Sequence, residues 1–179
     1  MLQSNIINHN LEKSFPYIHI THVSNDIISR TGLRIKHAME GADHEYSEKR
    51  IHLFSVVPES RPTYLIDNGV RRKLTVEEQA EIAFNDIQYD PVDYLSDILS
   101  DRDLDCMFND VISYKAELLN LSFKDFNIYA CKLSESYPVY SDTIMTSNKA
   151  RYVTQNIPAA NVKLLGSADI LLKIYNSRG

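Results

Sequence analysis

Apolar and polar residues alternate in the segment 16–23, PYIHITHV, near the start of the chain. In an extended chain Tyr17, His19 and Thr21 share one face, and the isoleucines between them share the other. This period of two predicts a half-buried strand, with a histidine and a threonine at the end that leads into the next element.

The residues after this strand predict a short helix and then a second strand. The helix covers 25–31, NDIISRT, with Ser24 or Asn25 as its N-cap and Gly32 at its C-terminal end. The second strand covers 50–57, RIHLFSVV. The two predicted strands therefore flank a short helix and a polar loop.

The middle of the chain carries apolar residues at helical spacing. Residues 74–86 open with a capping box formed by Thr75 and Glu78, which predicts the start of a helix. Segments 90–100 and 104–121 continue the helical pattern, the second of them as a longer amphipathic helix. Beyond them the pattern predicts five short strands, at 126–133, 138–142, 150–155, 162–165 and 168–175.

These elements predict an α+β fold in one domain, 1–179, with strands at both ends of the chain around a helical insert at 74–121. Residues 1–14 predict a polar N-terminal arm. The composition, 44% hydrophobic and 24% charged, is ordinary for a soluble globular protein. The polar start of the chain contains no apolar run of signal-peptide or membrane length, so a cytoplasmic location is expected.

The net charge of −5 is unevenly distributed. Residues 74–110 carry eleven carboxylates and one base, Arg102, a net charge of −10, so the rest of the chain carries +5. Solvated helix faces explain the acidic segment. The rest of the chain, with its net positive charge, tolerates a phosphate-bearing ligand. The basic residues Arg71, Arg72 and Lys73 follow Asn68 and predict a basic turn, or alternatively a substrate or RNA contact.

Histidines and cysteines do not predict a metal centre. All six histidines lie in the first 52 residues, but His19 and His22 are three apart on a strand and point to opposite faces. No HExxH or paired CxxC pattern accompanies them. Cys106 and Cys131 lie in apolar surroundings and are expected to be buried free thiols.

The opening segment resembles small ADP-ribosyltransferase-like proteins of bacteria and phages, related to the tRNA 2′-phosphotransferase and PARP-type clade. The pattern is an aromatic-x-His-x-Thr strand, a helix ending in Gly-Leu, a variable loop, and a strand of the type Arg-Ile-(Tyr/His)-Leu-(Phe/Ser)-Ser. The matching residues, in order, are Tyr17, His19, Thr21, Gly32, Leu33, Arg50, Ile51, His52, Leu53, Phe54 and Ser55. The closing segment of the family, a strand, an Ile-Pro turn and a final strand, is similar to residues 138–165, where Asn156, Ile157 and Pro158 carry the match.

The resemblance implies a split mixed or antiparallel sheet of ADP-ribosyltransferase type, with NAD⁺ as cofactor in a cleft where the two central strands part. By the same analogy the cofactor-binding residues are His19, Thr21, Tyr17 and Ser55, with His19 on a ribose hydroxyl. The implied activity is transfer of ADP-ribose to a protein or nucleic-acid acceptor, or removal of a phosphate from it, with release of nicotinamide.

The resemblance also implies three catalytic positions. His52 faces the nicotinamide ribose together with Ser55, so that the imidazoles of His19 and His52 meet the same bound nucleotide. Arg50 neutralises a pyrophosphate or substrate phosphate. Transferases of this fold place a glutamate on the third motif strand, where this chain has Thr154 and Gln155. A glutamine forms hydrogen bonds with a ribose hydroxyl but is no general base.

Two other functions use the same features. HIT at 19–21 and HLFS at 52–55 loosely resemble the paired His-x-Thr/Ser motifs of 2H phosphoesterases, in which two histidines act as acid and base on a cyclic phosphate. The acidic helices and the absent glutamate suit a non-catalytic phage or bacterial accessory protein that binds a partner.

Overall fold

The computed structural model describes residues 16–35, 50–56, 64–87, 90–133, 137–142 and 149–178. The arm expected at 1–14 and most of the loop that follows α2 lie outside these residues, as do His9, His37 and His44.

Six strands form one antiparallel sheet, in the order β6-β7-β2-β1-β5-β8. Their bounds are β1 Tyr17–Thr21, β2 Ile51–Ser55, β5 Asn127–Cys131, β6 Tyr140–Ser141, β7 Ala150–Val153 and β8 Val162–Ser167. A separate hairpin consists of β3 Tyr64–Asp67 and β4 Val70–Lys73. The helices are α2 Asn25–Thr31, α3 Val76–Asp86, α4 Pro91–Ile98, α5 Arg102–Leu119 and α6 Asp169–Arg178, with short 3₁₀ turns η2 Phe123–Asp125 and η3 Ala159–Asn161. The predicted α+β class is confirmed.

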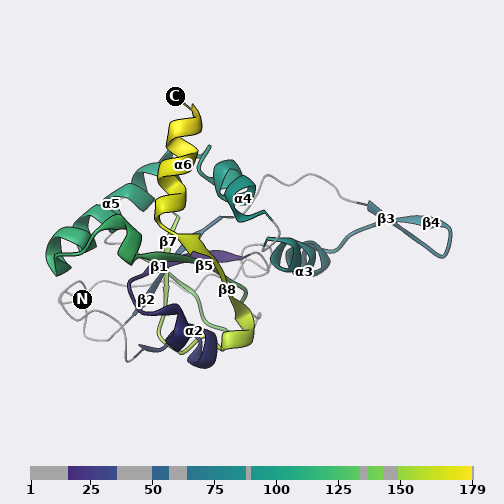
Figure 1. Ribbon diagram of the computed structural model, residues 1–179. Coiled ribbons are helices and arrows are strands. Elements are labelled where there is room, and N and C mark those ends of the chain that lie inside the picture. The colour runs from purple at the N-terminus through teal and green to yellow at the C-terminus, as the bar shows by residue number, and fades with distance from the viewer. Residues whose placement is uncertain are drawn as a thin grey trace.

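The sheet has a different covering on each face (Figure 1). Helices α4, α5 and α6 pack on one face, here called the helix-layer face, which carries Ile18, Ile20 and Phe54. Helix α2 packs on the other, the α2 face, which carries Tyr17 and Leu53. Strands β1, β2 and β5 thus contribute alternate side chains to two separate apolar cores.

The predicted start and end of α2 and the predicted start of α3 are confirmed. The Ser24 hydroxyl accepts from the Asp26 N–H at 3.2 Å, and the Gly32 N–H donates to the Ile28 carbonyl at 2.8 Å. Thr75 and Glu78 form the reciprocal capping box of α3. These caps occupy backbone groups that a helix end would otherwise leave without partners.

The acidic segment supplies much of the helix-layer core. Buried side chains of α3, α4 and α5, among them Phe84, Leu95 and Phe108, pack with the sheet. Many of the carboxylates of these helices are exposed, as expected for solvated faces. Within the described residues, no helix is both long enough and apolar enough to cross a membrane.

The strand predicted at 168–175 is wrong: most of it forms helix α6. Ala168, Leu171 and Ile174 are buried at intervals of three, whereas Leu172 is 46% exposed. The Ser167 hydroxyl accepts from the Asp169 N–H at 3.2 Å at the start of the helix. A short apolar run does not distinguish a strand from a buried helix by its periodicity, and packing against α4 and β8 selects the helix here.

The two cysteines differ from each other. Cys131 is a buried free thiol, as predicted, and burial raises its pKa. Cys106 is also free but lies exposed on α5, so its predicted burial is wrong.

Candidate functional site

The two central strands of the sheet part from each other at His19. Strand β1 pairs with β5 along all of its residues, from Tyr17 to Thr21. Its pairing with β2 on the other side covers only Tyr17 with Ser55 and Ile18 with Phe54. Strand β2 pairs with β7 from Ile51 to Phe54. Both β1 and β2 therefore remain in the sheet beyond the point where the hydrogen-bond ladder between β1 and β2 ends. This region is called the parted end below.

The imidazole of His19 spans the parted end. Its Nδ1 lies 2.6 Å from the backbone oxygen of His52. Because a carbonyl oxygen only accepts hydrogen bonds, Nδ1 carries the proton and Nε2 carries the lone pair. The contact therefore sets the tautomer of His19 and makes Nε2 a hydrogen-bond acceptor.

The surroundings of His19 keep it neutral. Burial and the nearby Lys115 ammonium lower the pKa of His19 to about 3, and they outweigh its hydrogen bond to His52, which raises it. Lys115 reaches the sheet from α5 and donates to the Ile20 carbonyl at 3.4 Å. A cation beside the parted strands also favours an anionic ligand there.

Thr21 and Tyr17 lie at opposite ends of β1. The buried Thr21 accepts from the Val23 N–H at 3.1 Å and so turns the chain from the strand into α2. The Tyr129 hydroxyl of β5 donates to the Asn25 side chain at 3.1 Å, which ties the first turn of α2 to the sheet. Tyr17 is buried at the closed end, where β1 and β2 still pair.

His52 and Arg50 project to the helix-layer face, away from His19. The neighbours of His52 along β2, Ile51 and Leu53, both belong to the core under α2, so His52 points the other way. Its Nδ1 lies 3.2 Å from the buried carboxylate of Asp142.

The guanidinium of Arg50 stacks 3.8 Å above the ring centroid of Tyr152. Tyr152 in turn stacks on Tyr140, with centroids 5.2 Å apart. These contacts join the end of β2 to β7 and β6 on the helix-layer face.

This geometry corrects two expectations. His52 and Ser55 are three apart on one strand and lie on opposite faces, so they do not face one ribose together. The imidazoles of His19 and His52 also lie on opposite faces, and only the His52 backbone carbonyl meets His19. The expectation that the imidazoles of His19 and His52 meet one bound nucleotide is therefore wrong, and the two rings do not form the histidine pair of a 2H phosphoesterase either.

Gln155 follows β7 at the end of the sheet where β2 begins. It is exposed in a bend directly after β7, whose last residue, Val153, pairs with Ile51 at the start of β2. Two residues further on, Ile157 forms a bridge with Leu33. Thr21 and Gln155 therefore lie at the same end of the sheet, on strands that β2 separates.

The two segments that carry the sequence resemblance meet in space. The Leu33 N–H donates to the Ile157 carbonyl at 2.9 Å, and the Ile157 N–H donates to the Leu33 carbonyl at 2.8 Å. The Asn156 side chain accepts from the Ile35 N–H at 2.8 Å. Gly32 allows this contact, because a Cβ there would lie 2.0 Å from the Ile157 oxygen.

Sequence reasoning missed Lys115 and Asp142. Lys115 lies in an amphipathic helix in which many charged positions are exposed, and Asp142 follows a two-residue strand. Neither position has a local motif, and only packing against the sheet distinguishes them. Among the described residues, no three His, Cys, Asp or Glu side chains gather to hold a metal ion.

Comparisons with protein-family models, with curated proteins and with solved structures found no match.

Proposed function

We propose that this chain binds NAD⁺ at the parted end of β1 and β2 and is an ADP-ribosyltransferase-like protein, which transfers ADP-ribose to a macromolecular acceptor and releases nicotinamide. The observation that carries the proposal is the end of the β1–β2 ladder at His19, with the imidazole held across the gap. A nucleotide cleft between parted central strands is what the resemblance implies.

His19 has the chemistry of a ribose-binding residue. Its Nε2 accepts a hydrogen bond from a ribose hydroxyl, and the low pKa keeps that lone pair available at neutral pH. A carbonyl partner fixes the ring orientation before a ligand arrives, which reduces the entropy lost on binding.

The reaction would break the bond between the nicotinamide nitrogen and C1 of the ribose, and the bonding electrons would leave with nicotinamide. Positive charge develops on the ribose, so positioning and electron-rich neighbours matter more than a strong nucleophile. The acceptor would form the new bond to C1 and lose its proton to solvent water. Gln155 can hydrogen-bond a ribose hydroxyl but does not take that proton.

The contact between Leu33 and Ile157 gives separate support. It joins the Gly-Leu end of the opening motif to the Ile-Pro turn of the closing motif. Arg50 and His52 receive a different role, because their contacts with Tyr152 and Asp142 hold β2 against its neighbours. The proposed site therefore rests on His19, Thr21 and Gln155.

The test is thermal unfolding with and without NAD⁺, followed by an assay for released nicotinamide. NAD⁺ at 100 times its dissociation constant is expected to add about 2.7 kcal/mol to the free energy of unfolding. His19→Ala is expected to abolish this shift. His22→Ala is the matched control, because it removes an imidazole that packs edge-on against Phe126 instead.

Each outcome bears on the proposal. A wild-type chain without an NAD⁺ shift, or a His19→Ala chain with an unchanged shift, would show that the site is wrong. NAD⁺ binding without nicotinamide release would favour the second candidate, a non-catalytic nucleotide-binding protein. That candidate is favoured by one observation, the glutamine at position 155 where a glutamate is usual.

A further inference from the structure

The β3–β4 hairpin extends away from the sheet, beyond α3 (Figure 1). Asn68 and Gly69 form its two-residue turn with φ of 51° and 77°, as a type I′ turn requires at both central positions. Its residues, 64–73, carry three cations and one carboxylate, a net charge of +2 in a chain of net charge −5.

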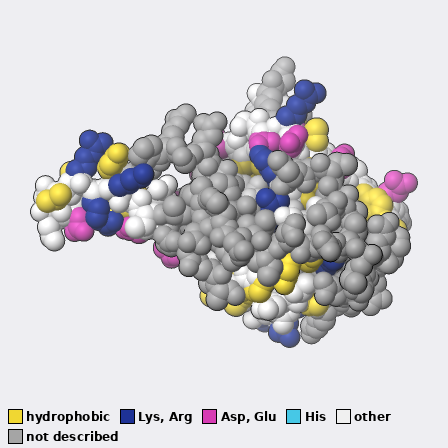
Figure 2. All heavy atoms as spheres, turned by 180° about the vertical axis from the view of Figure 1, so that it is seen from behind, with side chains coloured by type: hydrophobic (Ala, Val, Ile, Leu, Met, Phe, Trp, Pro, Cys, Tyr) yellow, Lys and Arg dark blue, Asp and Glu magenta, His cyan; other side chains and the backbone are white. Residues whose placement is uncertain are grey.

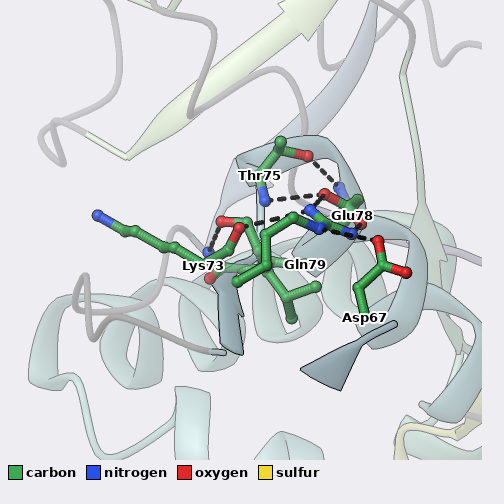
Figure 3. Close-up of polar contacts among 7 residues, drawn as sticks. Asp67, Lys73, Thr75, Glu78 and Gln79 are labelled. Carbon is green, nitrogen blue, oxygen red and sulfur yellow. Dashed lines mark hydrogen bonds and ion pairs between the residues drawn. The ribbon is translucent and has the colours of Figure 1, made fainter. Parts of the chain in front are cut away.

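One side of the hairpin is occupied by an internal ion-pair network (Figure 3). Arg72 binds the Glu78 carboxylate through two hydrogen bonds of 2.8 Å, and its Nε lies 3.5 Å from Asp67. Glu78 also accepts from the Thr75 N–H, and these bonds lower the pKa of Glu78 to about 2. The network fixes the hairpin to the start of α3 and engages the carboxylates of Asp67 and Glu78.

The other side of the hairpin presents cations beside apolar groups. The register pairs Tyr64 with Lys73 and Ile66 with Arg71, so these four side chains share one face, without an acidic residue. Ile66 is 78% exposed and Tyr64 is 46% exposed. The Arg71 guanidinium stacks 4.2 Å from the Tyr64 ring centroid. Figure 2 shows basic, hydrophobic and acidic side chains together on this protruding part of the molecule.

We propose that this face, Tyr64, Ile66, Arg71 and Lys73, binds single-stranded nucleic acid. Arg71 and Lys73 contact phosphates, and an unpaired base stacks on the Tyr64 ring or on the Arg71 guanidinium that lies over it. The stacked aromatic ring favours a nucleic acid over an acidic protein segment, which needs only the cations. The acidic segment 74–110 repels phosphates and confines the contact to the hairpin.

This inference is independent of NAD⁺ binding, because the hairpin and the parted end share no residue. The test is fluorescence anisotropy of the full chain with a labelled single-stranded oligonucleotide of mixed sequence, over a series of salt concentrations. Binding is expected at low salt and is expected to weaken as salt rises.

Two variants separate charge from stacking. The double variant Arg71→Ser/Lys73→Ser is expected to weaken binding by about tenfold or more and to reduce the slope of log affinity against log salt by about 1.4. Tyr64→Ala is expected to weaken binding by about 5- to 100-fold and to leave the slope unchanged. The matched control, Lys124→Ser/Lys173→Ser, removes two exposed cations elsewhere and is expected to retain the affinity.

The proposal would be overturned by no binding of the wild-type chain, by equal losses in the hairpin and control variants, or by wild-type affinity in Tyr64→Ala. Binding of polyglutamate as tight as that of the oligonucleotide would also overturn it, and would assign the face to acidic protein segments.

Discussion

Gly32→Ala is expected to lower the free energy of unfolding by about 3 kcal/mol or more. Gly32 has φ 72° and ψ −164°, a backbone region that is essentially limited to glycine. An added Cβ would lie 2.0 Å from the Ile157 oxygen and 2.6 Å from the Ala159 nitrogen. These are backbone atoms, so relief of the clash must shift the backbone at residues 157–159 and weaken its bridge with Leu33.

Gly69→Ala is the matched control for this prediction. Gly69 has a similar φ of 77°, but nothing lies within 4 Å of a Cβ there. Its substitution therefore carries only the conformational cost, about 1 kcal/mol. Denaturant unfolding of both variants measures the difference. Equal losses would mean that the contact between Gly32 and the closing segment is not as close as described.

Stability is expected to fall as the pH is lowered below 6.5, because of His19. Its pKa is about 3 in the folded chain, against an ordinary value of 6.5. Between these values the unfolded chain takes up a proton at this position and the folded chain does not, so acid favours unfolding. The slope contributed by one such group is at most about 1.4 kcal/mol per pH unit.

His19→Asn is expected to flatten this slope. Asparagine does not titrate, and its amide retains a donor for the His52 carbonyl. Denaturant unfolding between pH 6.5 and pH 5 measures the effect, above the range in which carboxylates titrate. Burial and Lys115 also lower the pKa of His22, so His22→Asn measures the second contribution. An unchanged slope in His19→Asn would show that His19 titrates normally in the folded chain.

Local signals in the sequence determined much of the secondary structure. Ser24 and Gly32 bound α2, and the Thr75–Glu78 box starts α3, because each signal acts within one turn of helix. The alternation of apolar and polar residues from Tyr17 to Thr21 likewise predicted β1, because successive side chains of a strand point to opposite faces. The spacing of three between His52 and Ser55 already places them on opposite faces of one strand.

Contacts between residues far apart in the chain depended on the tertiary structure. The register of β1 against β2 decides that His19 meets the His52 carbonyl and not the His52 ring. The hydrophobic pattern within each strand does not predict this register. Packing makes 169–178 a helix, where the apolar pattern alone fits a strand equally well. Lys115 reaches the parted end from a distant helix for the same reason. The sequence by itself determined the local conformations, and tertiary packing decided which of them face each other, because those contacts join residues far apart in the chain.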